Sequence, residues 1–405
     1  MKDAVFEGPW RDGNRVRLLE NGEQFFERAF AAISGARREI LLETFILFED
    51  KVGLELHRRL VEAARRGVRV EMTVDGYGSP AFSAGFLAAL ADAGARLRVF
   101  DPHRSLFGLR LHVFRRMHRK LLVVDGERAF VGGINYSADH LGDYGPKSKQ
   151  DYAVELEGPV VADLRDFALA AIGEHGNGDP WRHPAAIDGR EPAGTARVLF
   201  ELRDNATRRN NIEQQYRAAI RAARDAIVIA NAYFFPGYGL LRELKQAARR
   251  GVRVSLIVQG EPDMQIAMSA ARALYGELIG TGVDIHEYCE RPFHGKVALV
   301  DDEWATVGSS NLDPLSLSLN LEANVFIRDR AFNQALRERL DDLSLHHCRR
   351  VDAGSLPRRS AWQRLWQPLL YHAQRHFPAW AGLLPGHAPK VVLLAPSADD
   401  KPVGP

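Results

Sequence analysis

The sequence predicts an α/β fold made of two tandem α/β sandwich domains, one in each half of the chain. Three observations predict it. The chain has 405 residues, enough for two domains of about 100 to 200 residues each. The two halves repeat the same ordered series of segments. Within each half the expected order is helix, strand, helix, strand, helix and then a strand pair, which is typical of sheets covered by helices.

The internal repeat is clearest in two pairs of segments. Residues 40–48 (Ile-Leu-Leu-Glu-Thr-Phe-Ile-Leu-Phe) have a counterpart in residues 227–235, and both are short apolar runs typical of buried strands. Residues 63–70 (Ala-Ala-Arg-Arg-Gly-Val-Arg-Val) recur letter for letter at residues 247–254. There we expect basic residues and then Gly to end a helix before a strand begins. The shared order of the matches argues against chance.

Composition divides the chain into four parts. We expect a first domain over residues 1–172, a linker over 173–196, a second domain over 197–350 and a tail over 351–405. The linker is rich in Gly, Pro, Asp and His and has neither a helical nor a strand period. The tail carries many Pro and three of the six Trp, and it has no counterpart in the first half.

Charge and cysteine content restrict the function classes. The chain has 54 basic and 52 acidic side chains, a net charge of +2, so no global field recruits nucleic acid or an anionic membrane. The two cysteines, Cys289 and Cys348, show no Cys-x-x-Cys spacing, which favours a reducing compartment. We find no signal-peptide pattern and no apolar run of about 18 residues. We therefore expect a cytoplasmic protein that is neither exported nor membrane-spanning.

One pair of matched segments carries residues suited to chemistry. Each begins His-x-Lys, and each is expected to form a β-hairpin, because Asp-Gly or Asp-Asp between two β-rich runs supplies the positive φ angles of a two-residue turn. Lys offers a point charge, Asn an amide donor, and His a group that titrates near neutral pH. The sequence therefore predicts a phosphate site that contains a nucleophile or proton carrier. The matched positions, all 176 apart, are His118 and His294, Lys120 and Lys296, Asp125 and Asp301, and Asn135 and Asn311.

The expected register of the hairpins places small residues beside these groups. With Asp125 and Gly126 as the turn, His118 pairs with Gly133, and the same register in the second half pairs His294 with Ser309. Residues two apart on a strand share a face, so His and Lys point the same way, with Asn beside them. We expect a phosphate to approach the backbone at the small residue.

The carboxylates need separate interpretation. A single His-x-Lys pair is more often a surface histidine, but two copies at equal spacing favour a functional site. Asp125 and Asp301 belong to the candidate catalytic set, yet they stand where turns need Asp, and we favour a structural role for both. Asp151 and Glu322 follow the two Asn residues at similar distances. A carboxylate near a catalytic His fixes its tautomer, although either residue alone could be a solvated acid.

At these positions the sequence resembles the phospholipase D superfamily, whose signature is His-x-Lys-x4-Asp followed by Gly-Gly/Ser-x-Asn, present twice here. The resemblance implies that the two phospholipase D-like halves face each other across a pseudo-twofold, with the active site at their interface. It implies that Asp151 and Glu322 orient the histidines by hydrogen bonds. It also implies a covalent phosphatidyl-histidine, with His118 expected as nucleophile and His294 as acid and base. The lysines and asparagines would stabilise charge on the phosphate oxygens.

Residues 18–23, 75–80, 114–120 and 143–152 are similar to bacterial cardiolipin synthases, over about residues 10 to 385. This narrower resemblance implies transfer of a phosphatidyl group from a phospholipid such as phosphatidylglycerol to the hydroxyl of a second phospholipid, with release of a small alcohol such as glycerol. Phosphatidylglycerol, phosphatidylethanolamine and glycerol stay open as acceptors. We expect a peripheral enzyme at the cytoplasmic face of the cell membrane, with phospholipids and the membrane surface as partners and no nucleic acid.

We expect no cofactor and no metal, since no His-Glu-x-x-His or paired-Asp motif is evident. Residues 101–120 combine five Arg and one Lys with apolar residues and could hold anionic headgroups; a solvated loop is the alternative. The tail mixes Trp and Leu with Arg and could lie in a membrane interface or dock on the second domain. Two other functions remain open: a nuclease of the same superfamily, since DNA is also a phosphodiester, and a non-catalytic binder of anionic lipid.

Overall fold

The structure is a computed structural model that describes residues 9–102, 105–106, 109–110, 115–175, 191–260, 272, 274–352, 354 and 390–394. Residues 103–104, 107–108 and 111–114 of the basic stretch expected to hold headgroups, and the Trp-rich part of the tail, lie outside the described residues. Most of the expected linker lies outside them as well: α4 ends at His175, and β10 begins at Ala196.

The first half contains each element expected from the sequence and adds three strands, β1, β4 and β9, that extend the sheet on both sides. Its elements are β1 (Arg11–Glu20), α1 (Asn21–Gly35), β2 (Glu39–Thr44), α2 (Lys51–Arg65), β3 (Arg69–Asp75), α3 (Ala84–Asp92), β4 (Arg96–Phe100), β5 (Ser105–Leu106), β6 (Leu109–Arg110), β7 (Leu121–Val124), β8 (Arg128–Gly132), the short 3₁₀ turns η1 (Ala138–His140) and η2 (Gly142–Tyr144), β9 (Tyr152–Glu157) and α4 (Val160–His175).

The second half repeats this order, and residues 274–279 are helical where the first half has α3. Its elements are β10 (Ala196–Arg203), α5 (Asn211–Ala222), β11 (Ala226–Asn231), α6 (Tyr238–Arg249), β12 (Arg253–Gln259), β13 (Val283–Tyr288), β14 (Lys296–Val300), β15 (Trp304–Gly308), α8 (Pro314–Ser318), β16 (Glu322–Arg328), α9 (Arg330–Asp342), η3 (Leu343–His347) and β17 (Cys348–Arg350). In the expected tail, β18 (Val391–Leu393) pairs with β4 of the first half.

The predicted helix ends are confirmed at the two copies of Ala-Ala-Arg-Arg-Gly. Helices α2 and α6 stop just before Gly67 and Gly251, and both glycines adopt a φ of 90°. A residue without Cβ takes this left-handed conformation at little cost, which turns the chain from the helix into the next strand. Among the described residues, no helix is long and apolar enough to span a membrane.

Apart from β5 and β6, which pair with each other, the strands form one hydrogen-bonded order, β17-β13-β12-β11-β14-β15-β16-β10-β1-β9-β8-β7-β2-β3-β4-β18. In each half the inner strand of a parallel pair also pairs antiparallel with the hairpin: β2 with β7, and β11 with β14. Strand β1 joins the two halves, since its beginning pairs with β10 and its remainder with β9. The two sheets are therefore parts of one body.

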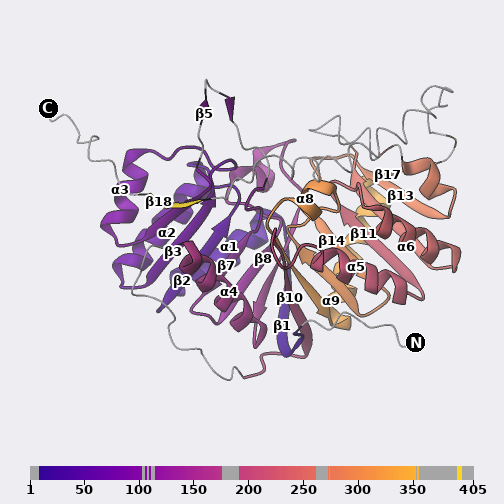
Figure 1. Ribbon diagram of the computed structural model, residues 1–405, viewed down its shortest axis with the longest axis horizontal. Coiled ribbons are helices and arrows are strands. Elements are labelled where there is room, and N and C mark those ends of the chain that lie inside the picture. The colour runs from indigo at the N-terminus through magenta and orange to yellow at the C-terminus, as the bar shows by residue number, and fades with distance from the viewer. Residues whose placement is uncertain are drawn as a thin grey trace.

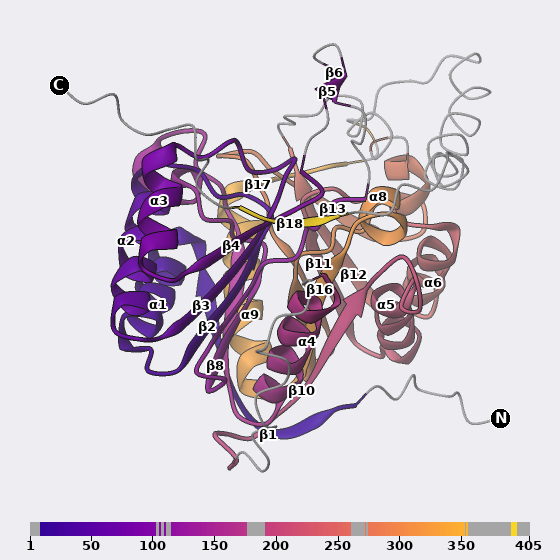
Figure 2. The ribbon, with the colours of Figure 1, turned by 60° about the vertical axis from the view of Figure 1, so that its left-hand side comes forward.

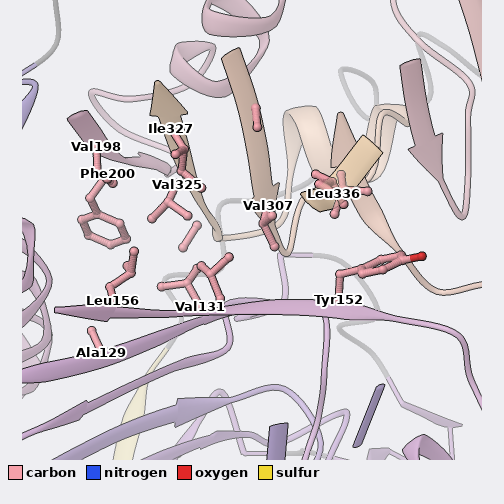
Figure 3. Packing of buried hydrophobic residues seen from close by; sticks show 14 of the residues in the cluster. Ala129, Val131, Tyr152, Leu156, Val198, Phe200, Val307, Val325, Ile327 and Leu336 are labelled. Carbon is pink, nitrogen blue, oxygen red and sulfur yellow. The ribbon is translucent and has the colours of Figure 1, made fainter. Parts of the chain in front are cut away.

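The molecule is layered, with the two sheets facing each other at its centre (Figures 1 and 2). Helices α1, α2 and α3 cover the outer face of the first sheet, and α5 and α6 cover the outer face of the second. A third hydrophobic cluster lies between the sheets, where Val131 and Leu156 of the first half pack toward Phe200, Val325 and Ile327 of the second (Figure 3). Helix α4 contacts β10, and α9 contacts β1, so each half also covers part of the other.

The turn of the first hairpin is longer than predicted. Asp125 and Gly126 have the expected positive φ values of 52° and 58°, and the carbonyl of Val124 accepts the N–H of Glu127 at 2.9 Å. Pairing then resumes only at Arg128, which lies opposite Val124. Glu127 is therefore an extra residue in the turn, and the register moves by one position.

This shift makes the predicted partners of the histidines wrong. The ladder between β7 and β8 begins with Leu121 opposite Val131, so His118 precedes it and does not pair with Gly133. The second hairpin has the same shifted register, and His294 does not pair with Ser309. Hairpin rules consider the turn alone, whereas here the turn aspartates are also held by another segment of the chain.

Candidate active site

The two candidate histidines are each held by a carboxylate from the other half of the chain. His118 Nδ1 lies 3.0 Å from Glu322 Oε2, and His294 Nδ1 lies 2.6 Å from Asp151 Oδ2. Both carboxylates are completely buried behind the rings. With Nδ1 engaged, Nε2 is the ring nitrogen left for a substrate.

Backbone hydrogen bonds between the two halves bring each histidine next to the carboxylate of the opposite half. The N–H of His118 donates to the carbonyl of Leu321 at 2.9 Å, and the N–H of His294 donates to the carbonyl of Gln150 at 2.8 Å. Leu321 and Gln150 directly precede Glu322 and Asp151. Each histidine is thus tied by its backbone and its ring to the same short segment of the opposite half.

Two further residues hold the backbone just before each histidine. Asp75, at the end of β3, accepts the N–H of Met117 at 2.8 Å, and Gln259, at the end of β12, accepts the N–H of Phe293. Burial raises the pKa of Asp75 to about 6, although the backbone N–H groups that donate hydrogen bonds to it lower this pKa. Sequence reasoning missed this pair, although both stand at the same position of the two repeats, 184 residues apart.

Both lysines are buried in the same site. Their Nζ atoms donate to the carbonyls of the histidines two residues before them, at 2.6 Å for Lys120. Burial lowers the pKa of Lys120 to about 7 and that of Lys296 to about 8, while Asp151 and Glu322 act in the opposite direction. Because the lysines also repel each other, an anion placed between them would be strongly stabilised.

The surroundings of both histidines favour the neutral ring in the absence of an anion. Burial and the lysines lower the pKa of His294 well below its ordinary value, and burial lowers that of His118, where Glu322 opposes the shift. In a neutral ring whose Nδ1–H donates to a carboxylate, Nε2 carries a lone pair. That is the protonation state a nucleophile or general base requires.

The small residues of the two motifs, Gly133 and Ser309, lie against the carboxylates Asp151 and Glu322. The expectation that a phosphate approaches the backbone at these small residues was wrong. A Cβ at Gly133 would lie 2.3 Å from Asp151 Oδ1, so only glycine leaves room for this carboxylate. Ser309, at the equivalent position, donates its hydroxyl to Glu322 Oε2 at 2.5 Å. Burial raises the pKa of Asp151, whereas His118 and the Ser309 hydroxyl lower that of Glu322.

The two asparagines lie in buried positions after the hairpins. Asn135 Oδ1 accepts the N–H of Ile46 at 3.1 Å, which orients the side chain and leaves its NH₂ group as a donor. Asn311 Oδ1 has no hydrogen-bond partner among the described residues. Each amide therefore keeps capacity for a further hydrogen bond.

Asp125 and Asp301 lie at the hairpin turns and bind backbone groups. Each adopts a positive φ and accepts hydrogen bonds from three successive N–H groups of the segment that leads into the neighbouring strand, residues 37–39 for Asp125 and residues 224–226 for Asp301. These contacts connect the first hairpin to β2 and the second to β11. A structural role is therefore sufficient to explain why each turn has an aspartate.

A third imidazole, His140, was missed by sequence reasoning. It is fully buried in η1, and its ring stands edge-on to that of His294 with centroids 5.8 Å apart. Ligand atoms of His140, Asp151 and His294 all lie within 4.8 Å, a grouping that could hold a metal ion. The available signal was the loop between Asn135 and Asp151, which is five residues longer than its counterpart.

Comparison with known proteins places this site in a family. A family model described as "Cardiolipin synthase, PLD-like domain" matches residues 30–166 and 216–344. Cardiolipin synthase B of Salmonella typhi is 54% identical over 391 residues, which cover 96% of this chain and 94% of that protein. Cardiolipin synthase B of Escherichia coli strain K12 is 53% identical over the same coverage. The crystal structure of phosphatidylserine synthase from Haemophilus influenzae Rd KW20 shares the fold, with a TM-score of 0.64, 15% identity, and coverage of 91% of this chain and 95% of that one.

Proposed function

The chain belongs to the phospholipase D-like family of cardiolipin synthases, and on that premise we propose that it joins two phospholipids at the site between His118 and His294. It is a phosphatidyltransferase that acts on phospholipids. The donor that fits this activity best is phosphatidylglycerol, and the product is cardiolipin.

One observation supports the proposed chemistry above the others: two imidazoles, each backed by a buried carboxylate, share one site with two buried lysines. A two-step transfer needs a nucleophile and a separate proton carrier. The site supplies two equivalent imidazoles for these tasks. The lysines supply the positive charge that a transferred phosphoryl group requires.

In the first step, Nε2 of His118 attacks phosphorus, and the bond from phosphorus to the glycerol oxygen breaks. The bound anionic phosphodiester favours the form of His294 that is protonated on Nε2, and His294 gives this proton to the glycerol oxygen as glycerol leaves. In the second step, His294 takes the proton of the acceptor hydroxyl, whose oxygen attacks phosphorus and breaks the bond to His118. The phosphatidyl group ends on the acceptor, and both rings return to their starting states.

The remaining site residues act on charge. Lys120 and Lys296 neutralise the phosphate oxygens, and the amides of Asn135 and Asn311 donate hydrogen bonds to them. Glu322 stabilises the positive charge that develops on His118, as a carboxylate does for a catalytic imidazole. No step in this scheme requires a nucleotide, because one phosphodiester is exchanged for another.

The substrates place the reaction at a membrane surface. Phospholipids of natural chain length reside in bilayers, so the enzyme has to act as a peripheral protein, and we assign it to the cytoplasmic face of the cell membrane. Phosphatidylglycerol is the proposed donor, and a second phosphatidylglycerol, whose headgroup carries free hydroxyls, is the proposed acceptor. We do not expect nucleic acid as a partner.

The test uses purified protein and vesicles that contain labelled phosphatidylglycerol, with and without phosphatidylethanolamine, and in the presence of EDTA. We expect cardiolipin and free glycerol in equal amounts, detected by mass spectrometry, with no loss of rate in the chelator. Cleavage of labelled single-stranded DNA in place of lipid turnover would contradict the proposal in favour of a nuclease. Vesicle sedimentation without turnover of either substrate would contradict it in favour of a lipid-binding protein.

A further inference from the structure

The two halves of the site differ most at the second donor to each carboxylate. Glu322 Oε2, which holds His118, also accepts the hydroxyl hydrogen of Ser309 at 2.5 Å. No hydroxyl can take the equivalent place beside Asp151, since even a Cβ at Gly133 would lie 2.3 Å from Asp151 Oδ1. The internal repeat alone therefore leaves Asp151 Oδ2 without the donor that its counterpart has.

His140 lies beside Asp151, on the side where this donor is missing. Its Nδ1 lies 3.8 Å from Asp151 Oδ2, the oxygen that binds His294, and it has no hydrogen-bond partner in the described parts of the chain. The shorter counterpart loop of the second half, between Asn311 and Glu322, contains no histidine. The third imidazole is therefore a feature of one half only.

The other ring nitrogen of His140 determines its tautomer. Nε2 accepts the backbone N–H of Asn135 at 3.2 Å, and an accepting nitrogen carries no proton. A neutral ring must then carry its proton on Nδ1, the atom that faces Asp151. His140 thereby connects the backbone of a candidate phosphate-binding residue with the carboxylate that holds His294.

We propose that His140 is a positioning residue for the His294–Asp151 pair: its Nδ1–H, which faces Asp151 Oδ2 at 3.8 Å, approaches to become the second donor for that oxygen, in the place that the Ser309 hydroxyl takes for Glu322. The expected effect on the reaction rate rests on the proposed function. The arrangement of His140, Asp151 and His294 does not depend on that function. As positive charge develops on His294, Asp151 must act as a fixed carboxylate. A donor from His140 keeps Oδ2 aimed at His294 Nδ1 and favours its ionised form.

The surroundings of His140 favour its neutral ring at pH values near 7. Burial lowers its pKa to about 3, with Lys149 acting in the same direction and Asp151 and Asp139 opposing it. Lys149 pairs with Asp139 at 2.5 Å, and His294 is the remaining titratable neighbour. The tautomer is therefore expected to persist across neutral pH, so the donor to Asp151 does not switch with pH.

Two amide substitutions separate the two bonds of the ring. In His140→Asn the amide NH₂ falls near the position of Nδ1, so the donor toward Asp151 is kept and the acceptor for Asn135 is lost. In His140→Gln the amide oxygen falls near Nε2, so the acceptor is kept and the donor is lost. We expect His140→Gln to melt within a few degrees of the wild type, to lose about 10- to 100-fold in kcat with little change in KM, and to have a shifted pH profile.

We expect His140→Asn to keep kcat within about threefold of the wild type and to keep its pH profile. Ser309→Ala, which removes the corresponding donor from Glu322, should lower kcat as His140→Gln does. A wild-type rate and pH profile in His140→Gln, or an equal loss in both amide variants, would overturn the proposal.

A spectroscopic measurement separates this inference from the proposed function. Nitrogen-15 NMR of histidine-labelled protein without lipid should show His140 neutral and protonated on Nδ1, and the Nδ1 signal of His294 should move in His140→Gln but not in His140→Asn. If the wild type turns over no lipid, the proposed function fails, while these signals still test the positioning role. A His140 ring protonated on Nε2 would refute it whatever the activity.

Discussion

His118 Nδ1 lies 3.0 Å from Oε2 of Glu322, a residue 204 positions later in the chain. The reciprocal pair, His294 with Asp151, spans 143 positions. Neither half therefore supplies both the imidazole and the carboxylate of either pair in the site. The packing of the two sheets and the function of the site depend on the same interface, because the cluster between the sheets fixes the distance across which both pairs form.

The two histidines should be separately essential. We expect His118→Ala and His294→Ala each to abolish cardiolipin formation, because the scheme needs both a nucleophile and a proton carrier. His346→Ala, at an exposed position in η3, serves as the control and should retain full activity. Measurable turnover in either site variant would mean that one imidazole suffices, and the two-step scheme would be wrong.

The crossed carboxylates should affect rate more than binding. Glu322→Gln and Asp151→Asn keep the side-chain shape but remove the charge that stabilises each imidazolium, and we expect losses of about 10- to 100-fold in kcat with KM little changed. Steady-state kinetics on a soluble short-chain phosphodiester gives both constants. Glu303→Gln, at the exposed turn of the second hairpin, is the matched control. A change confined to KM would show that the carboxylates serve substrate binding instead.

The lowered pKa values of the two lysines predict that activity falls as the pH rises above about 7. Lys120, with a pKa of about 7, and Lys296, with a pKa of about 8, are charged below these values and lose their charge above them. The nucleophile His118, whose pKa is lowered, stays neutral until the pH falls below its ordinary value near 6.5. The free enzyme should therefore show a bell-shaped kcat/KM with its maximum near or just below pH 7. A plateau that extends past about pH 9 would mean that the lysines keep their charge.

The turn aspartates should contribute stability. Asp125→Asn keeps a residue that tolerates positive φ but removes the charge that binds three N–H groups. We expect a loss of about 1 to 3 kcal/mol in the free energy of unfolding, measured by urea denaturation, with normal kcat in the folded protein. Asp143→Asn, which breaks only the exposed pair with Lys51, should cost less than about 1 kcal/mol. Unchanged stability with complete loss of activity would assign Asp125 to catalysis.

Much of the fold followed from the sequence because the repeat is visible residue by residue. The His, Lys and Asn positions were found since both copies keep equal spacing, and Gly67 and Gly251 fixed the ends of α2 and α6. The crossing of His118 with Glu322 was not derivable from the repeat, because two equivalent halves do not reveal which carboxylate serves which ring.

The errors have local causes. The hairpin register was wrong because the turn aspartates also bind residues from a distant segment, which a rule for isolated turns cannot include. His140 was missed because it breaks the repeat, and a search for matching positions discards what occurs in one half only. Asp75 and Gln259 were missed because they match in place but differ in type.

The stereochemistry at phosphorus tests the covalent step most directly. Each in-line displacement inverts phosphorus, so transfer through a histidine adduct inverts it twice, and the cardiolipin formed should retain the configuration of the donor. Phosphatidylglycerol made chiral at phosphorus with oxygen isotopes and sulfur provides the measurement, and glycerol should be released before the acceptor enters. Net inversion would mean that the acceptor hydroxyl attacks the donor directly. In that case neither His118 nor His294 forms a bond to phosphorus, and the two carboxylate-backed rings act only as acid and base.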